Sequence, residues 1–413
     1  MNVYSPILEA KLEDAGLTLK KIFFTNFEYL KKLLIYKKSA FNMMELPEKV
    51  RRTLEKLVKE LMVREEVYGL GLFGSWSRGD ATTSSDVDLI IVSSGNFEDE
   101  YVERIALNGL LIDLDFIPKR WIHGPTPPEL DQKLYEAQIL YDRDWSLANA
   151  KLWMTKSYSS PERVEIRTEA HIIESDIYLS RATSALSKGD LQSAKFFAPA
   201  AMENTLKVLM EIALEPFSNS RFIEKVEAST RKLGMPRLFK EYLEIAELDK
   251  LDSGIVEEKL KLLRTVWDEI SLTIKQNPKA LEKTHFKVKT KLKYYLNPAF
   301  IHGAIQRTNA LMASKNFAEA AHYLNSIFLP IVENYAWLKS SMEKLKIDHT
   351  CLISSLESLE KKNPKNYQNI IKFLNMGYVE KQEATETIEK VRRHMLEIRG
   401  ERKLLIKNHI SKS

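Results

Sequence analysis

Cysteine is almost absent from this sequence, in which Cys351 is the single thiol among 413 residues. One cysteine forms no intramolecular disulfide and supplies no thiolate cage for zinc. The sequence therefore excludes a disulfide-stabilised fold and argues against a zinc module. A chain without structural disulfides is typical of a reducing compartment, so we expect a cytoplasmic protein.

Long apolar runs are missing as well. No stretch approaches the roughly 18 uninterrupted apolar residues that a membrane span needs. Glu9, Lys11, Glu13 and Asp14 interrupt the amino terminus, where a signal peptide would be apolar. We therefore expect a protein that is not exported and has no membrane partner.

Neither sign of charge dominates the chain. Its 62 basic and 57 acidic residues leave a net charge of +5 at pH 7. Such a small excess identifies no partner for the whole chain, so local clusters have to be considered instead. A length of 413 residues exceeds what one hydrophobic core usually serves, and it predicts two or three domains.

The residue pattern divides the chain into four parts. Residues 1–45 mix apolar and basic residues at helical spacing, which predicts a helical N-terminal extension. Residues 46–150 carry strand and helix patterns in turn and predict an α/β unit. Strand signals end there, while apolar residues keep helical spacing. We expect a helical bundle over residues 151–275 and a second one with a basic segment over residues 276–413.

The α/β unit begins with an amphipathic helix from Leu46 to Glu66, because Pro47 suits a first helical turn and apolar residues recur at helical intervals. The elements expected after it are strands at Val67–Phe73, Val87–Val92 and Leu110–Ile117, a loop from Gly74 to Ser85 and a helix near Glu98–Leu107. Tyr135–Asp142 also looks like a strand.

Two segments of the helical half resemble each other faintly. Residues 181–194 and residues 307–320 each predict a helix, a short turn and a second helix. Two copies are too few for a solenoid but fit two related bundles in tandem. Chance similarity between amphipathic helices is the alternative.

Two carboxylates mark the start of the second expected strand. Asp86 and Asp88 project from the same face, because side chains alternate along a strand, while Val87 and Leu89 point into the core. Two like charges on one face repel each other unless a cation lies between them. Mg²⁺ prefers carboxylate and phosphate oxygens, so we expect Mg²⁺, or Mn²⁺, at this position.

A loop of small residues precedes these carboxylates. Gly74 lets the backbone turn and approach a ligand, Ser75 offers a hydroxyl and a backbone amide, and Arg78 adds positive charge. With Ser85, these are the candidate triphosphate-binding residues. A phosphate site that faces a metal site predicts nucleotidyl transfer.

A third carboxylate comes from the strand at Leu110–Ile117. Asp113 and Asp115 share one face of that strand, beside the first pair. All four aspartates are candidate metal ligands, and one of the later two completes the catalytic set. Asp113 is the first choice, and Asp115 serves if the register is shifted by two residues.

The motif resembles the signature of the DNA polymerase β superfamily, especially its minimal nucleotidyltransferase and kanamycin nucleotidyltransferase-like branches. The residues that carry the resemblance are Gly74-Ser75, Arg78-Gly79 and Ser85-Asp86-Val87-Asp88-Leu89. It implies an α+β fold, in which a polymerase β-like domain with a mixed sheet flanked by helices precedes a large all-α region of helical bundles.

The resemblance also implies roles for individual residues. Gly74 and Ser75 would bind the triphosphate, for which ATP is the expected donor, and Asp86 and Asp88 would hold two metal ions. Asp113 would be the third ligand and the base. In such a mechanism the two ions lie about 3.5 to 4 Å apart and act on the attacking and leaving oxygens, with release of pyrophosphate.

The acceptor is left open by the sequence, since an RNA end, a small molecule or a protein hydroxyl presents the same nucleophile. The most basic segment, residues 275–295, combines lysines with aromatic residues and favours RNA. A run of lysines is, however, also typical of a solvated face.

Two further readings concern function. A regulatory nucleotide-binding module of a toxin–antitoxin-like system, without turnover, is the rival to an enzyme. The pair Arg167 and His171 is similar to the arginine and histidine motif of ribonuclease partner domains. Its spacing is one residue short, which argues against a nuclease.

Overall fold

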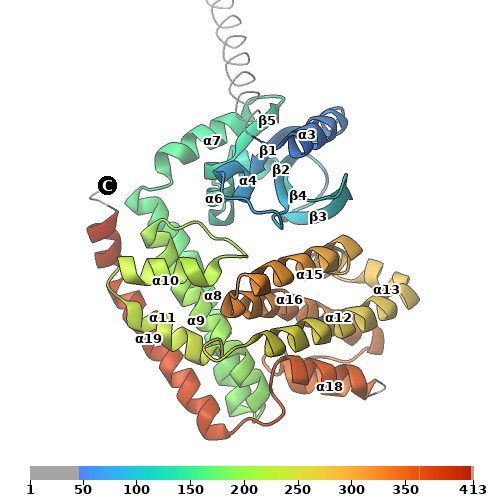
Figure 1. Ribbon diagram of the computed structural model, residues 1–413, viewed down its shortest axis with the longest axis vertical. Coiled ribbons are helices and arrows are strands. Elements are labelled where there is room, and N and C mark those ends of the chain that lie inside the picture. Colours follow the sequence, from blue (N-terminus) through green and yellow to red (C-terminus); the bar gives the residue numbers. More distant parts are fainter. Residues whose placement is uncertain (1–45, 362, 411–413) are drawn as a thin grey trace, which may run out of the picture.

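The computed structural model of the protein describes residues 46–361 and 363–410, so the extension expected over residues 1–45 lies outside the described residues. A sheet unit lies at one end and a larger helical part lies beneath it (Figure 1). The expected α+β fold class is therefore confirmed. No described helix combines the length and the apolar character that crossing a membrane requires.

The sheet unit spans the first described part of the chain. Its elements are α3 (Glu48–Leu61), β1 (Val67–Phe73), α4 (Gly74–Arg78), β2 (Val87–Ser93), β3 (Tyr101–Leu107), β4 (Leu110–Pro118), α5 (Arg120–His123), a 3-10 turn (Pro128–Leu130), α6 (Asp131–Glu136), β5 (Gln138–Asp142) and α7 (Ser146–Ser157). The five strands lie in the order β3-β4-β2-β1-β5. Only β2 and β4 run parallel, so the sheet is mixed.

Apolar side chains cover both faces of this sheet. On one face, the apolar stripe of α3 packs against β1 and β2, where Leu54, Leu57, Leu70 and Leu89 are buried. On the other face, a second cluster joins the sheet to α6 and α7. The central strands are buried on both sides, which explains their nearly continuous apolar sequence.

The structure corrects one expected helix. Residues 101–107 form strand β3 and not part of a helix over Glu98–Leu107. The strand pairs with β4 through a two-residue turn, at which Asn108 and Gly109 have φ values of 53° and 69°. An Asn-Gly pair between two strands is the typical signal of a tight hairpin, because both residues adopt positive φ easily.

Smaller corrections concern element bounds. The loop expected from Gly74 to Ser85 begins with the short helix α4, and the first helix ends at Leu61 and not at Glu66. The last strand begins at Gln138, since the residues before it belong to α6.

The helical part consists of two series of helices, which are joined by two short helices. Each series begins with two helices connected by a short turn. The first series is α8 (Pro161–Ser187), α9 (Leu191–Ala213), α10 (Phe222–Lys232), α11 (Pro236–Ile245) and α12 (Ser253–Gln276). The linking helices are α13 (Pro278–Lys283) and α14 (Phe286–Tyr295). The second series is α15 (Pro298–Ala313), α16 (Phe317–Glu343), α17 (Leu352–Leu359), α18 (Pro364–Phe373) and α19 (Lys381–His409).

The two series follow the same order of long and short helices. The segments at residues 181–194 and 307–320 form the α8–α9 and α15–α16 turns, so the helix, turn and helix expected for each is confirmed. Both second helices end at a residue in the left-handed conformation, Leu214 in α9 and Lys344 in α16.

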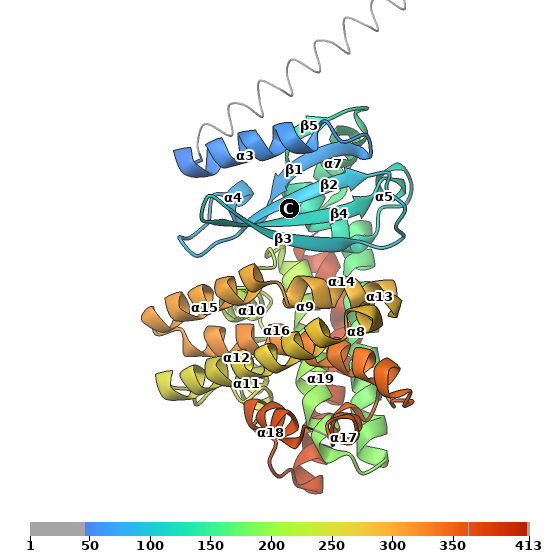
Figure 2. The same cartoon turned by 90° about the vertical axis from the view of Figure 1, so that its right-hand side faces the viewer.

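The last helix of each series packs on the other series. Helix α19 lies along α8 and α9, while α12 lies along α16 and α18. Figure 2 shows α19 beside α8 and α9. One continuous cluster of buried apolar side chains extends from Val164 to Ile410 and includes both series. The two series are therefore held together because each one contributes its last helix to the packing of the other, which we call the helix exchange.

Candidate active site

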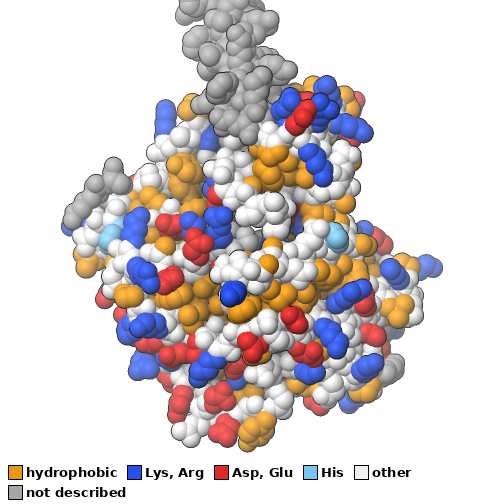
Figure 3. Space-filling model, in the orientation of Figure 1, with side chains coloured by type: hydrophobic (Ala, Val, Ile, Leu, Met, Phe, Trp, Pro, Cys, Tyr) orange, Lys and Arg blue, Asp and Glu red, His pale blue; other side chains and the backbone are white. Residues whose placement is uncertain are grey.

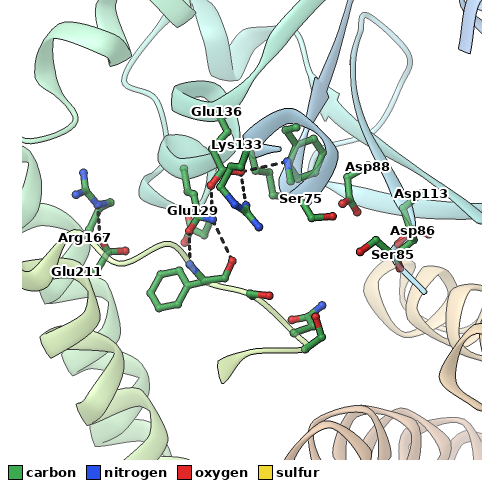
Figure 4. Close-up of a pocket in the computed structure, with 18 of the residues that line it drawn as sticks. Ser75, Ser85, Asp86, Asp88, Asp113, Glu129, Lys133, Glu136, Arg167 and Glu211 are labelled. Carbon is green, nitrogen blue, oxygen red and sulfur yellow. Dashed lines mark hydrogen bonds and ion pairs between the residues drawn. The ribbon is translucent and has the colours of Figure 1, made fainter. Parts of the chain in front are cut away.

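Three aspartates converge where β2 and β4 run side by side. Asp88 of β2 is paired in register with Asp113 of β4, and Asp86 immediately precedes β2. Val87 and Leu89 are fully buried on the opposite side, as strand alternation requires. Figure 4 shows the three aspartates near one another at one side of a pocket.

Arg104 of β3 binds two of these carboxylates. It lies directly opposite Asp113, to which Nε donates a hydrogen bond at 2.6 Å and Nη2 a second one at 2.6 Å. The same Nη2 also donates to Asp86. Because the guanidinium group is planar and fully charged, this pairing fixes the direction of both carboxylates.

Two side chains from the helical part join the same network. Arg307 of α15 donates to Asp86 Oδ1 at 2.6 Å, and the Tyr294 hydroxyl of α14 donates to Asp113 Oδ2 at 2.9 Å. The helical part thus contributes directly to the geometry of the aspartates.

The aspartates differ in their electrostatic environment. Burial raises the pKa of Asp88 well above its usual range, and repulsion from Asp86 and Asp113 adds to this rise. Burial would also raise the pKa of Asp86, but Arg307 and Arg104 outweigh it and hold that pKa below its usual range. A buried carboxylate that faces two others provides a favourable position for an added cation.

Oxygen donors of this kind fit a divalent metal ion, because Mg²⁺ and Mn²⁺ favour carboxylates. Among residues 46–361 and 363–410, no group of three or more acidic, histidine or cysteine side chains is arranged as a metal site. Arg104 and Arg307 neutralise Asp113 and Asp86 in this arrangement. An ion bound between the aspartates would have to compete with these guanidinium groups.

Gly74 allows the loop after β1 to approach Asp88. Its φ is +73°, and a Cβ atom there would lie 2.3 Å from Asp88 Oδ2. Its backbone N–H donates to Glu136 Oε2 at 3.1 Å. Ser75 borders the same cavity as the aspartates. Only glycine fits this backbone position beside the carboxylate.

Arg78 and Ser85 line the cavity but are already engaged. Arg78 donates to Glu136 Oε2 at 2.8 Å and lies 3.3 Å from Asp80 Oδ1. Ser85 Oγ accepts a hydrogen bond from the Thr82 backbone N–H at 2.8 Å. Neighbouring carboxylates therefore balance much of the charge that Arg78 was expected to add, and Ser85 closes a turn of the loop.

Asp115 has different neighbours from Asp113. Its Oδ2 accepts a hydrogen bond from Lys133 at 2.5 Å, and Lys133 also donates to Glu100 at 2.7 Å. Burial raises the pKa of Asp115 to about 7. Of the two candidates for the third carboxylate, Asp113 lines the cavity with Asp86 and Asp88, whereas Asp115 is not among the described residues that line it.

The cavity has a volume of about 430 Å³ and lies between the sheet unit and the helical part. Ser75 and the three aspartates form one side, and Arg167, His171 and Glu211 from α8 and α9 form the other. Figure 4 shows Arg167 and Glu211 across the pocket from Ser75, with Lys133 and Glu136 between them. The segment Phe217–Ser220 completes the lining.

This segment, which we call the floor segment (Phe217–Ser220), is bound to the sheet unit at its first residue and through the residue that follows it. The Phe217 N–H donates to Gln132 Oε1 at 2.9 Å, and the Phe217 carbonyl accepts from Gln132 Nε2 at 3.2 Å. Next to it, Arg221 donates to the Asp80 carbonyl at 3.3 Å. The two parts of the molecule therefore form the cavity together.

The basic segment at residues 275–295 belongs mainly to α13 and α14. Lys287 lies 3.2 Å from Asp99, and Lys293 lies 2.8 Å from Glu282. Among the described residues that line the cavity, none is a lysine of this segment. The Tyr294 hydroxyl binds Asp113, so this residue contacts the aspartates and is not an exposed ring on which a nucleic-acid base could stack.

Comparison with known proteins identifies the sheet unit. Residues 51–140 match the nucleotidyltransferase domain family. A protein of Methanocaldococcus jannaschii is 35% identical over 85 residues, which cover 18% of this chain and 81% of the relative. The chain belongs to the polymerase β-like nucleotidyltransferase family.

A second M. jannaschii relative of this nucleotidyltransferase is 31% identical over 87 residues, which cover 18% of this chain and 81% of that protein. Both relatives are named "Putative protein adenylyltransferase". A crystal structure of a nucleotidyltransferase-like protein from Exiguobacterium sibiricum aligns over 78% of this chain and 90% of its own, with 14% identity and a TM-score of 0.29. We draw no conclusion from a likeness at that score.

The sequence motif did not identify several residues of the nucleotidyltransferase cavity. The sequence pattern predicts a helix at Arg104, whereas the Asn-Gly turn after it is the signal of a strand. The pattern places Glu136 in a strand and gives no sign of its contacts with Gly74 and Arg78. Tyr294 and Arg307 belong to helices that are distant in sequence from the motif. No local pattern predicts their contacts with the aspartates.

Proposed function

We propose that this nucleotidyltransferase moves an NMP group from a nucleoside triphosphate, with ATP as the donor, to an acceptor hydroxyl and releases pyrophosphate. One observation carries the proposal: Asp88, Asp86 and Asp113 converge in one cavity with Gly74 and Ser75. A carboxylate cluster beside a glycine-serine turn suits phosphoryl chemistry, because catalysis there is mainly positioning and charge stabilisation.

Each residue has a defined part in this proposal. Ser75 donates its hydroxyl and amide hydrogen bonds to phosphate oxygens, and Gly74 keeps that turn close to Asp88. Asp86, Asp88 and Asp113 would hold Mg²⁺ or Mn²⁺. When bound, the ions neutralise triphosphate charge and acidify the acceptor hydroxyl. Asp113 accepts the hydroxyl proton, while Tyr294 and Arg104 orient its carboxylate.

The reaction balances without any further reactant. The acceptor oxygen forms a bond to the α-phosphorus, and the bond between this phosphorus and the α,β-bridging oxygen breaks. Pyrophosphate leaves with the electron pair of that bond, and the acceptor proton passes to Asp113. ATP as the donor is supported by the names of the two adenylyltransferase relatives.

An RNA acceptor is the less favoured form of the proposal. The lysines of residues 275–295 lie on α12 to α14, and several of them pair with acidic residues such as Glu282. Figure 3 shows basic and acidic side chains intermixed over the visible face. An RNA bound through these lysines would still show an affinity that falls steeply with salt.

The experiment that tests the proposal follows the label of α-³²P triphosphates. The protein is incubated with each triphosphate, Mg²⁺ or Mn²⁺, and separated RNA, protein and small-molecule pools. Transfer from ATP into one pool is expected, and Asp88→Asn should abolish it. Asp268→Asn, a matched change on the exposed surface of α12, should not alter it.

The rival, a regulatory module without turnover, predicts a different result. The proposal is falsified if folded protein binds triphosphate and metal but transfers label to none of the pools. Recovery of intact triphosphate at the end of that incubation would favour the regulatory reading.

A further inference from the structure

The Glu136 carboxylate binds two groups of the turn that precedes the aspartates. Glu136 is the last residue of α6 and lines the candidate active site. Its Oε2 accepts a hydrogen bond from the Gly74 N–H at 3.1 Å and another from Arg78 Nη1 at 2.8 Å. Arg78 Nη2 lies 3.3 Å from Asp80 Oδ1. Carboxylates of the protein itself therefore engage the amide and the guanidinium group on this side of the cavity.

These two donors are of the kind that binds phosphate. Backbone N–H groups and guanidinium groups bind the oxygens of phosphates and of carboxylates in the same way. In the proposed reaction the α-phosphorus lies at the aspartates, and Ser75 binds phosphate oxygens. Figure 4 shows the aspartates on one side of Ser75 and Glu136 on the other. The β- and γ-phosphates of a triphosphate would therefore extend towards the Glu136 carboxylate and its two donors.

The helical part helps to hold this carboxylate in place. Gln132 Nε2 donates a hydrogen bond to Glu136 Oε1 at 2.7 Å. The same Gln132 amide binds the backbone N–H and the carbonyl of Phe217, at 2.9 Å and 3.2 Å. The side chain of Glu136 is only 5% exposed, so these hydrogen bonds are largely shielded from water. The floor segment, Gln132 and Glu136 thus form one chain of contacts that leads from the helical part to Gly74 and Arg78.

We propose that Glu136 is an autoinhibitory residue, whose carboxylate has to leave Gly74 and Arg78 before the β- and γ-phosphates of a nucleoside triphosphate bind there. The floor segment favours the inhibitory position through Gln132. The inference rests on the proposed function, because that function supplies the triphosphate.

Competition between the carboxylate and the phosphates has two physical causes. Like charges that share the same donors repel each other, and this repulsion is strong where water is excluded. The carboxylate also has to give up charge-assisted hydrogen bonds when it leaves. The apparent dissociation constant of a ligand rises in inverse proportion to the fraction of molecules that are competent to bind it. The affinity for triphosphate is therefore set by how firmly Gly74, Arg78 and Gln132 hold Glu136.

Removal of the carboxylate tests the inference by calorimetry. Inorganic pyrophosphate, ATP and AMP are titrated, at a fixed Mg²⁺ concentration, into the wild type, Glu136→Ala, Glu136→Gln and Glu129→Ala. Glu129→Ala is the matched control, because it removes the same charge from the lining of the same cavity, whereas Gly74 and Arg78 are bound by Glu136. Glu136→Gln keeps the size of the side chain and tests the inference if Glu136→Ala does not fold.

Glu136→Ala should bind pyrophosphate and ATP about tenfold more tightly than the wild type, because a larger fraction of molecules is competent. Glu136→Gln should shift both affinities about threefold in the same direction, since a neutral amide is a weaker acceptor and does not repel phosphate. Glu129→Ala should change them by less than about twofold, because the exposed Glu129 charge is screened. AMP lacks the β- and γ-phosphates, so its affinity should be the same for all of these proteins.

Gln132→Leu tests the link to the helical part. It removes the hydrogen bond to Glu136 Oε1, so pyrophosphate should bind about threefold more tightly. In a protein that already carries Glu136→Ala, the same change should have no further effect, because Gln132 acts through Glu136. Equal tightening with and without the Glu136 carboxylate would overturn the role of the floor segment.

The direction of the change in affinity decides between competition and support. Unchanged or weaker pyrophosphate binding by Glu136→Ala and Glu136→Gln overturns the inference and leaves the proposed function intact, because Glu136 would then only brace the turn. Equal tightening by Glu136→Ala and Glu129→Ala overturns it as well, since any charge in the cavity would act alike. If neither pyrophosphate nor ATP binds to the wild type or to any variant, the proposed function itself is contradicted, and the inference fails with it.

Discussion

At the scale of single residues, the two later aspartates are separated by their neighbours. Asp113 faces the cavity with Asp88, whereas Asp115 is bound by Lys133. We expect Asp113→Asn to lower the transfer rate by about 100-fold or more while ATP binding persists, because a base or ligand is lost and the shape is kept. Asp115→Asn should have a mild effect. Steady-state kinetics on both variants measure the two transfer rates. A larger loss of rate in Asp115→Asn than in Asp113→Asn would make Asp115 the third carboxylate.

Gly74 offers a second test with an internal control. Its Cβ would lie 2.3 Å from Asp88 Oδ2, whereas a Cβ at Gly79, with φ of +82°, would meet nothing within 4 Å. Both changes to alanine carry the cost of a left-handed backbone, about 1 to 2 kcal/mol. Only Gly74→Ala should also abolish transfer. Thermal unfolding and activity separate the two effects, and equal activities would show that the Asp88 contact is unimportant.

At this scale, the sequence predicts contacts between residues that are close to one another along the chain. Asp86, Asp88, Gly74 and Ser75 lie within one short motif, so their proximity follows from strand alternation and one turn. Arg307 reaches Asp86 only through tertiary packing. No spacing rule connects residues so far apart, which is why the motif could not reveal this contact.

At the scale of elements, α15 brings a cation to the aspartates. Arg307 donates to Asp86 Oδ1 at 2.6 Å, and a metal ion on that oxygen has to compete with it. We expect Arg307→Gln to tighten Mn²⁺ binding about tenfold, since a competing charge is removed. Arg181→Gln is the matched control, because Arg181 pairs with Glu333 within the helical part. Titration of Mn²⁺ by electron paramagnetic resonance measures both, and equal affinities would mean that the ion does not use Asp86 Oδ1.

A partly buried lysine joins three helices. Lys259 of α12 donates to Asn325 Oδ1 of α16 at 3.2 Å and to the Phe373 carbonyl of α18 at 2.7 Å. Burial lowers its pKa to about 8. Because the folded pKa lies below the unfolded value, Lys259 contributes stability above pH 10.5 that is lost as pH falls to about 8.

The wild type should therefore gain stability relative to Lys259→Met as pH rises through this window. The expected gain is roughly 2 to 3 kcal/mol, after allowance for partial exposure. Urea unfolding at several alkaline pH values measures it. A constant difference between the two proteins would show that the Lys259 pKa is not lowered by folding.

Elements with strong local signals were predicted well, and those that depend on pairing were not. The apolar strands β1, β2 and β4 were found from composition and length. Strand β3 was missed, because its buried Arg104 has no apolar pattern and is stabilised by Asp113 on the neighbouring strand. Helices α13 and α14 carry so many lysines that their sequence indicates an RNA-binding segment or a solvated face, and neither interpretation predicts the contact of Tyr294 with Asp113.

At the scale of the whole molecule, the exchange of α12 and α19 ties the helical series together. The sequence predicts separate bundles over residues 151–275 and 276–413, and those boundaries remain predictions. Helix α19 buries Ile388, Val391, Met395 and Ile398, among others, and packs on α8 and α9. Such contacts span the length of the helical part, so local periodicity does not predict them.

A fragment of residues 46–275 lacks α19 and tests whether the first series is independent. Leaving the faces under α19 exposed would cost on the order of 10 kcal/mol, which is comparable to the stability of a whole domain. We expect helices α8 to α12 of this fragment to show no cooperative thermal transition by circular dichroism. Co-expression with residues 276–413, which supply α19, should restore one transition for a 1:1 complex. Cooperative unfolding of the isolated fragment at the temperature of the full chain would instead establish the boundary at residue 275 and make the helix exchange dispensable.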